Sequence, residues 1–283
     1  MRNSVEIVSD AAKGIKLELL AEAYCVLKSV IRVSHDEMRT VLSEWNRGEL
    51  ADPLVAAAAD VLGLRDEDGD PLLEKVLDLP RGSELCRPAA ALALKLGVPA
   101  PLAAQSACAS LTARMKDERI DASALLTGPK AALTGERHVM IEELRKAVLA
   151  SFILAYAEAY SLSFASGDDD EAARAALADD GSFVATAAAA ARDRRGHKGT
   201  ILLDAEIKAR LDPALPSLRR ICSRAAEGGI YIPCLAAALS YYDGLRSSWL
   251  PSNLVVALRD SLDGTLYERI DRPRGEAFHS DWK

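Results

Sequence analysis

The sequence has few aromatic side chains. Phe, Trp and Tyr together make up only 5% of its 283 residues, whereas alanine is abundant. Sheets favour aromatic and β-branched residues, while closely packed helices accept a core of Ala, Leu, Val and Ile, so this composition favours an all-α fold. Hydrophobic residues at 49% and charged residues at 27% are typical of a globular protein with a large core.

Signals for metals, nucleotides and membranes are also missing. The five cysteines are far apart, with no CxxC pair and no histidine at ligand spacing, which predicts neither a zinc site nor a disulfide framework. No GxGxxG follows an apolar strand and no GxxxxGK[ST] occurs, so no nucleotide-binding loop is predicted. The sequence shows no signal-peptide core and no apolar run of about 18 residues. We therefore expect a cytoplasmic protein with reduced thiols, no metal, no cofactor and no membrane contact.

Positive charge is in short supply. The net charge of -7 argues against sequence-independent nucleic-acid binding, which depends on many Lys and Arg contacts to phosphate. A basic cluster within 192–198 follows an acidic run at 168–171. We interpret the two as a pair of charged loops, and we expect no nucleic-acid partner.

Apolar side chains recur at helical spacing along the chain, in segments bounded by Gly, Pro or Asp. No repeat of fixed period is present. We expect a single helical domain over 1–283. The predicted helices cover 5–33, 36–50, 53–62, 71–78, 87–96, 100–117, 137–165, 171–193, 203–227, 232–247 and 251–263.

The first predicted helix carries three charged residues on one face. Spacings of four and three bring Glu6, Asp10 and Lys13 together, beside an apolar face. Opposite charges at this spacing usually only solvate a helix surface, so a working acid–base site is the second interpretation. The apolar face consists of Val5, Val8, Ala12, Ile15 and Leu19.

Three stretches and the end of the chain indicate a family. SEWNRGELADPLVAAAADVL (43–62), MKDERIDAS (115–123) and the run from GIYIPCLAAALSYYDG to DGTLYERI (229–270) resemble the all-helical C-terminal domain of 6-phosphogluconate dehydrogenase. EAFHSDW (276–282) resembles the tail of that family, and the order and spacing of all these pieces agree. The resemblance covers nearly the whole chain, with one shortening around 185–200. It implies the helical array of that domain, without the Rossmann domain that binds NADP in the family.

The resemblance also implies that the catalytic positions have changed. The general-base lysine of the family aligns with Glu6, and its general-acid glutamate aligns with Lys13. Its His-Asn pair aligns with Ser9 and Asp10, and its phosphate-binding tyrosine aligns with Gly14. Since the acid and base positions carry exchanged charges, we predict no oxidation of 6-phosphogluconate.

The residues that anchor the substrate in the family are mostly replaced as well. Its GQKGTGKW loop corresponds to RGSELCRP (81–88), and a lysine expected after DERIDAS is Ala124. Arg145 and Arg259 are kept, although the histidine expected six residues after Arg259 is Thr265. The two arginines could bind an anion, together with Tyr242 in the kept SYYDG motif. Pairing of each arginine with a nearby carboxylate such as Glu142 or Asp260 is an equally good interpretation.

The tail implies a homodimer. In the family this segment inserts into the partner subunit, so we expect residues 264–283 to dock there. His279, beside Phe278 and Trp282, is then an interface residue.

Two classes of function fit a chain that keeps fold-forming motifs and loses chemical ones. One is an enzyme repurposed for cofactor-independent chemistry in the old cleft, such as a cyclase, lyase or isomerase of specialised metabolism, acting through Glu6, Asp10 and Lys13. The other is a non-catalytic dimer that binds a small anionic ligand or a partner protein, for instance a chain that supplies a nucleotide-binding domain. The exchanged charges at positions 6 and 13 favour the enzyme slightly, because random loss would more often leave Ala or Ser.

Overall fold

The computed structural model describes residues 3–81, 85–129, 135–167, 181–195 and 200–282, together with residues 175, 177 and 178. The chain divides into two compact units, Met1–Tyr241 and Tyr242–Lys283, and each is described by itself. The acidic run at 168–171 lies outside the described residues, and so do residues 196–198 of the basic cluster and part of the predicted helix 171–193. Residues 192–195 of the basic cluster belong to a helix, so the prediction of a loop was wrong for them.

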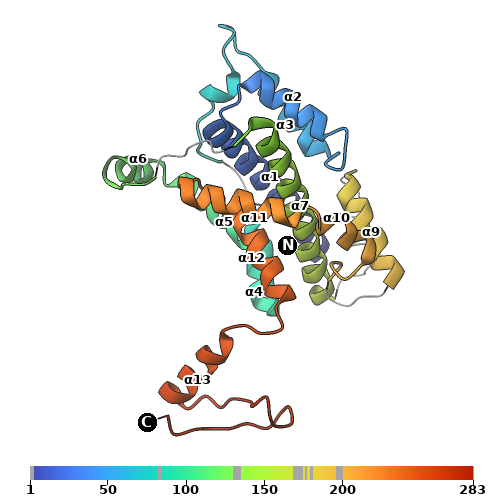
Figure 1. The fold of residues 1–283 in the computed structure, drawn as a ribbon, viewed down its shortest axis with the longest axis vertical. Coiled ribbons are helices and arrows are strands. Elements are labelled where there is room, and N and C mark those ends of the chain that lie inside the picture. The colour runs from blue at the N-terminus through green and yellow to red at the C-terminus, as the bar shows by residue number, and fades with distance from the viewer. Residues whose placement is uncertain are drawn as a thin grey trace. The chain divides into compact units, whose positions relative to one another are not determined.

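Helices form almost all of the regular structure in the described residues, as the composition predicted (Figure 1). Extended segments pair only at two isolated bridges within this part of the chain, Arg65 with Pro71 and Tyr267 with Phe278. The α-helices are α1 (Ser4–Val26), α2 (His35–Trp45), α3 (Pro53–Gly63), α4 (Arg87–Leu96), α5 (Pro101–Arg114), α6 (Lys116–Leu125), α7 (Arg137–Ser166), α9 (Phe183–Arg195), α10 (Ala205–Leu211), α11 (Leu215–Gly228), α12 (Pro233–Arg246) and α13 (Ser252–Asp263).

Helix α7 forms the core of the first unit, packed against α1 and α11 (Figure 1). Small side chains such as Ala147, Ala150 and Ala155 are buried along it, which lets neighbouring backbones approach closely. By length and composition α7 could cross a membrane, which the run-length argument had not anticipated. Its most apolar window is 89% buried inside the protein, as expected of a core helix, so this is weak evidence for a membrane span.

Helix α1 begins close to its predicted start, and only with the π-helical segment that follows it does the helical stretch approach the predicted end at residue 33. The Asn3 side chain caps it by accepting a hydrogen bond from the Glu6 backbone N–H at 2.8 Å. Four of the five residues of the predicted apolar face are buried, and Val5 is half-buried. The helix then widens into a short π-helical segment, Leu27–Ile31, and ends at Arg32 in the left-handed region with φ of 59°.

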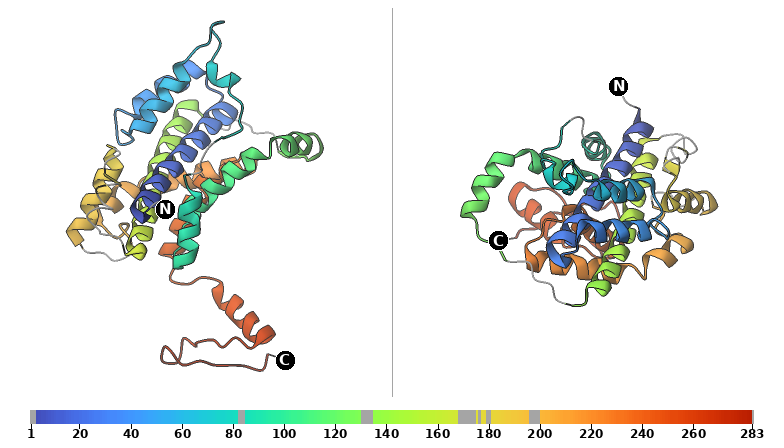
Figure 2. Two further views of the ribbon diagram at one scale, coloured as in Figure 1. Left: turned by 180° about the vertical axis from the view of Figure 1, so that it is seen from behind. Right: turned by 90° about the horizontal axis from the view of Figure 1, so that it is seen from above.

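Three helix predictions were wrong in detail. The predicted helix 71–78 is only a short 3₁₀-helix, Leu72–Lys75. The predicted helix 203–227 is two helices, because the chain breaks between α10 and α11 around Pro213, which cannot donate a backbone hydrogen bond. Helix α6 follows α5 almost directly and was missed, since it buries none of its residues and therefore has no core-facing apolar stripe. Figure 2 shows α6 standing away from the other helices of the first unit.

Two buried carboxyls, one on α7 and one on α1, accept hydrogen bonds from the first backbone N–H groups of neighbouring helices. Glu158, on α7, accepts hydrogen bonds from the backbone N–H groups of Leu102 and Ala103 at the start of α5, both at 2.8 Å. Glu22, on α1, accepts them from Cys234 and Leu235 at the start of α12, at 2.6 and 2.8 Å. Each carboxyl thus satisfies backbone donors that have no partner inside their own helix.

A buried lysine joins α1 to α3 and α7. Lys16 is 1% exposed, and its Nζ lies 2.8 Å from Oδ2 of Asp52 and 3.0 Å from the hydroxyl of Tyr156. The other carboxylate oxygen of Asp52 caps α3 by accepting from the Leu54 N–H, and the Tyr156 hydroxyl lies 3.0 Å from Oγ of Ser182. The lysine charge is thus balanced by a carboxylate that also holds a helix start.

The second unit is organised around Asp260, at the end of α13. This side chain is buried and lies 2.8 Å from Nδ1 of His279, and it accepts hydrogen bonds from the Ser280 N–H at 3.0 Å and from Nε1 of Trp282 at 2.6 Å. The Tyr267 ring lies 5.7 Å from the Trp282 ring. The segment after α13 therefore folds back on that helix.

Candidate functional site

The three charged residues predicted as catalytic lie on successive turns of α1. Glu6 and Lys13 are exposed and Asp10 is half-buried, while the apolar face of the helix points into the core. Exposed carboxylate and ammonium groups keep their hydration and lack the burial that tunes catalytic groups. A catalytic role for these three residues stays a prediction.

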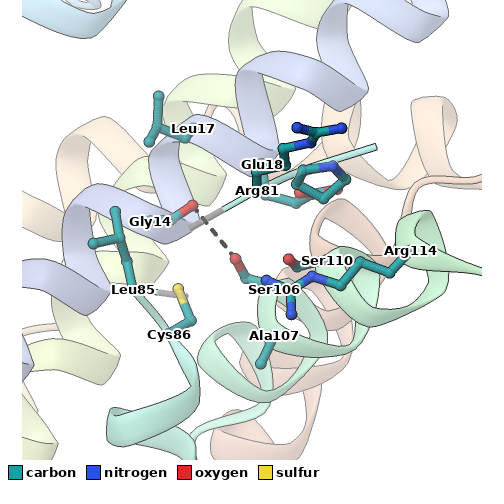
Figure 3. A pocket seen from close by; sticks show the side chains of 11 residues that line it. Gly14, Leu17, Glu18, Arg81, Leu85, Cys86, Ser106, Ala107, Ser110 and Arg114 are labelled. Carbon is teal, nitrogen blue, oxygen red and sulfur yellow. Dashed lines mark hydrogen bonds between the residues drawn. The ribbon is translucent and has the colours of Figure 1, made fainter. Parts of the chain in front are cut away.

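A cavity of about 210 Å³ opens one turn further along α1 (Figure 3). It lies between α1, the connection before α4, and α5. We call it the first cavity. Its lining residues are Gly14, Leu17, Glu18, Pro80, Arg81, Leu85, Cys86, Ser106, Ala107, Ser110 and Arg114.

Gly14 and Cys86 form one wall of the first cavity. A Cβ atom on Gly14 would lie 2.5 Å from Sγ of Cys86 and 2.9 Å from Cβ of Leu85, distances that no real side chain shows. The Ser106 hydroxyl donates a hydrogen bond to the Gly14 carbonyl at 3.4 Å, so α5 also lies close to the bare helix backbone. Position 14 therefore requires glycine in this packing.

Two arginines bring positive charge to the first cavity. Figure 3 shows Arg114 extending from α5 towards Ser106 and Ser110, and Arg81 also lines the cavity. Within the residues that the structure describes, Arg81 forms no ion pair. Burial raises the pKa of Glu18, the one carboxyl in the lining, which favours its neutral form. Two guanidinium groups and two hydroxyls are suited to binding an anion.

The cysteine in the wall is not suited to nucleophilic chemistry. Burial raises the pKa of the Cys86 thiol to about 11, so at neutral pH the sulfur stays protonated. Its Sγ lies 3.6 Å from the Ala11 carbonyl oxygen, which accepts a weak hydrogen bond. Cys86 therefore shapes the cavity and is no candidate for covalent catalysis. Among the described residues, no group of three or more His, Cys, Asp or Glu side chains is arranged to hold a metal ion.

The other predicted substrate-binding residues lie apart from the lining of the first cavity. Arg145, on α7, forms a two-pronged ion pair with Glu142, with both nitrogen–oxygen distances at 2.8 Å, as the alternative interpretation predicted. Arg259, in the second unit, pairs with Asp263 at 3.6 Å and donates to Oγ1 of Thr265 at 3.1 Å. Tyr242 is half-buried near the end of α12. The two arginines are thus already engaged by neighbouring side chains.

Comparison with known proteins agrees with the helical array. The family described as 6-phosphogluconate dehydrogenase, C-terminal domain, matches residues 3–179 and 180–282. This chain belongs to that family. The decarboxylating 6-phosphogluconate dehydrogenase of Haemophilus influenzae is 33% identical over 287 positions, which cover 98% of this chain and 59% of that protein. The NADP(+)-dependent, decarboxylating enzyme of Bacillus subtilis is 33% identical over 289 positions, covering 98% of this chain and 61% of its own length.

A solved structure shows the same fold. The 6-phosphogluconate dehydrogenase of Plasmodium falciparum superposes with a TM-score of 0.89 at 23% identity, covering 98% of this chain and 62% of that one. The chain thus spans about three fifths of the length of these relatives. The resemblance seen in the three sequence stretches is confirmed, and so is its extent.

The sequence argument missed most of the first cavity. It noted Gly14 and the segment 81–88 as lost family positions, but it singled out none of Glu18, Ser106 and Arg114. In a helical pattern, Glu18 and Arg114 look like ordinary surface charges. Their shared cavity depends on contacts between residues about 70 to 100 positions apart, and local periodicity carries no signal for such contacts.

Proposed function

We propose that this chain binds a small anionic metabolite in the first cavity and does not oxidise 6-phosphogluconate through its first helix. The observation that carries this proposal is the lining of the first cavity. It combines Arg81 and Arg114 with two serine hydroxyls, and Gly14 on α1 exposes its backbone beside them because it has no side chain. Arginine binds carboxylate and phosphate groups with directed, charge-assisted hydrogen bonds.

Loss of the family reaction follows from the exchanged groups on α1. By the resemblance, a lysine base and a glutamic acid act where this chain has Glu6 and Lys13. A carboxylate and an ammonium group in swapped places cannot transfer the same protons along the same paths. The tyrosine that aligns with Gly14 could not be accommodated either, because Cys86 fills the space above that position.

Cofactor-independent acid–base chemistry is the enzymatic form of this proposal. Glu18 lines the first cavity, and burial raises the pKa of its carboxyl, which brings proton exchange with a bound anion closer to neutral pH. Glu6, Asp10 and Lys13 lie on preceding turns of the same helix and would complete the acid–base set. A cyclase, lyase or isomerase reaction requires no more than such proton transfers.

A non-catalytic binding protein is the second candidate, and the exposure of the first helix favours it. Glu6 and Lys13 are exposed to water, and a catalytic pair normally gains strength from exclusion of water. In this form the chain would bind its ligand, a partner protein, or a separate nucleotide-binding chain that works on sugar acids.

We also propose that the protein is a cytoplasmic homodimer. All five cysteines are free thiols, which suits a reducing compartment. The second unit exposes large apolar side chains along α13 and the tail, and a dimer would cover them. They include Leu254, Val255, Leu258, Leu262 and Ile270. Hydrogen bonds from His279 and Trp282 to Asp260 hold this tail against α13. Both side chains remain partly exposed, so a partner subunit could contact them.

A thermal-shift screen tests the binding proposal. The purified protein is melted with 6-phosphogluconate, NADP, other sugar acids and a metabolite library, beside Arg81→Ala/Arg114→Ala, Glu6→Ala and Lys13→Ala variants. We expect an anion to raise the melting temperature of the parent protein and not of the double arginine variant. Loss of stabilisation in Glu6→Ala and Lys13→Ala as well would support the repurposed enzyme. Unchanged melting with every anion would contradict the proposal.

A turnover assay tests the predicted loss of the family reaction. The protein at high concentration is given NADP and 6-phosphogluconate, and the absorbance of NADPH is followed. No NADPH should form. Formation of NADPH in proportion to the protein added would show that the first helix still supports the family reaction.

A further inference from the structure

A second and larger cavity lies beside the first one. Its volume is about 640 Å³, within the range of about 300 to 1,000 Å³ that small-molecule sites span. Glu18, Pro80 and Ser110 line both cavities, so the two spaces share a wall. We call the larger one the apolar chamber. Its other lining residues are Ala21, Leu77, Asp78, Leu79, Ala109, Thr112, Ala113, Arg119 and Tyr231.

The two cavities differ in chemistry. The first cavity has the Arg81 and Arg114 guanidinium groups and two serine hydroxyls, whereas Ala, Leu and Pro side chains make up half of the residues that line the apolar chamber. Leu77 at its edge is 60% exposed, and Tyr231 is also largely exposed. Apolar side chains left open to water around a concave surface mark a place where an apolar group binds.

Asp78 and Arg119, two of the three acidic or basic residues that line the apolar chamber, pair with each other. Asp78 accepts a hydrogen bond from Nη2 of Arg119 at 2.9 Å and forms a second ion pair with Lys116. These two partners hold the pKa of Asp78 down to about 2, so its negative charge is balanced within the protein. The chamber therefore offers hydrocarbon surface, and the guanidinium groups of Arg81 and Arg114 lie in the neighbouring first cavity.

We propose that the ligand of this site is an acid with an apolar body, whose carboxylate or phosphate group binds Arg81 and Arg114 and whose hydrocarbon part lies in the apolar chamber. The inference rests on the proposed anion binding and adds the class of ligand. A sugar acid carries hydroxyls along its whole length, and those that face Leu77, Leu79 and Ala109 would lose their hydration without a hydrogen bond in return. Glu18 and Ser110, shared by both spaces, mark the point where the acid group meets the body of the ligand.

A chain-length series tests this inference. Titration calorimetry compares butanoate, hexanoate and octanoate, then octyl phosphate, octanol, gluconate and inorganic phosphate. Each added methylene should tighten binding of the alkanoates about two- to fourfold, because it removes hydrocarbon surface from water. Octanol and gluconate, which each lack one half of the pattern, should bind at least about tenfold more weakly than octanoate. Comparing the affinities of octanoate and octyl phosphate shows which acid group the site prefers.

Matched variants separate the two halves of the site. Leu77→Asp should abolish the dependence on chain length and leave the weak binding of inorganic phosphate, whereas Leu94→Asp, at an exposed leucine outside both cavities, should change neither. Arg81→Ala/Arg114→Ala should weaken every acid about tenfold, and Arg274→Ala, an exposed arginine in the second unit, should not. Melting temperatures of all variants report whether each one is folded.

The outcomes separate the apolar body of the ligand from the proposed anion binding in the first cavity. If the acids bind through Arg81 and Arg114 but affinity does not rise with chain length, the apolar body is wrong and anion binding stands. If gluconate binds as tightly as octanoate, the inference fails in the same way. If no acid depends on the two arginines, the proposed function fails and takes this inference with it.

Discussion

Gly14 and Cys86 approach each other so closely that a methyl group on the glycine would lie 2.5 Å from the cysteine sulfur. The contact joins the first helix to the connection before α4, and both segments line the first cavity. The tyrosine expected at position 14 from the family resemblance could not occupy the same space as this sulfur. The shape of the first cavity is therefore set jointly by residues at positions 14 and 86.

We predict that Gly14→Ala destabilises the protein by about 1 to 3 kcal/mol, the range for overpacking a well-packed contact. Cys86→Ala should recover part of this loss in the double variant, because it removes the sulfur that the new methyl group meets. Gly244→Ala, where a Cβ meets nothing within 4 Å, is the matched control and should be neutral or slightly stabilising. Urea unfolding measures all four proteins, and equal stability of Gly14→Ala and the parent would contradict the packing.

The helical fold could be predicted from sequence because its signals are local. The buried residues Val8, Ala12, Ile15 and Leu19 repeat at helical spacing, and this pattern predicted both the helix and its inward face. The family stretches then predicted the global array. Helix α6 escaped prediction because a helix without buried residues has no such pattern.

The buried lysine on the first helix could not be predicted in the same way, and neither could the cavity lining, which depends on equally distant contacts. Lys16 is followed in the sequence by Leu17, yet it is Lys16 that is buried and Leu17 that is exposed. The reason is a carboxylate 36 residues away and a tyrosine hydroxyl 140 residues away, which balance the charge and accept its hydrogen bond. Pairing over such distances depends on the tertiary fold, so a composition or periodicity argument cannot anticipate it.

The Lys16–Asp52 pair gives a second prediction. Lys16→Met should cost about 3 to 5 kcal/mol, because it leaves the buried Asp52 carboxylate without its counter-ion. Adding Asp52→Asn should recover part of that loss, since asparagine removes the unpaired charge and still caps α3. Lys208→Met breaks an exposed pair with Asp212 and should change stability by less than about 1 kcal/mol. Additive losses for Lys16→Met and Asp52→Asn in chemical denaturation would show that the two side chains do not depend on each other.

The buried carboxyls predict how stability depends on pH. Burial raises the pKa of Glu22 to about 8 and that of Glu158 to about 7. The backbone N–H groups that donate hydrogen bonds to each carboxyl lower its pKa, but by less than burial raises it. A carboxyl with a raised pKa binds its proton more tightly in the folded state than in the unfolded chain, so it stabilises the fold fully below pH 4.5. This contribution is lost as the pH rises through 7 and 8. Stability should therefore fall between pH 5 and pH 8.

Glutamine variants assign that pH dependence. Glu22→Gln and Glu158→Gln keep an acceptor oxygen for one of the two helix N–H groups and remove the titrating proton. Each should therefore lower stability at every pH and flatten the decline in urea midpoint between pH 5 and pH 8. Glu206→Gln, at a partly exposed position on α10, is the control and should leave the slope unchanged. A parent protein with constant stability across this range would contradict the assignment.

The exposed apolar surface of the second unit predicts self-association. Leu254 and Leu258 lie one turn apart on α13 and are 62% and 51% exposed, and a dimer interface would remove them from water. Light scattering of the parent protein at micromolar concentration should give the mass of a dimer. Leu254→Asp/Leu258→Asp should shift it to a monomer, because a carboxylate placed at an apolar interface loses its hydration without a partner. Leu94→Asp, at an exposed leucine of the first unit, is the control for adding charge alone. A parent protein that is monomeric at this concentration would overturn the proposed dimer, and a double variant that stays dimeric would show that the interface lies elsewhere than on this face of α13.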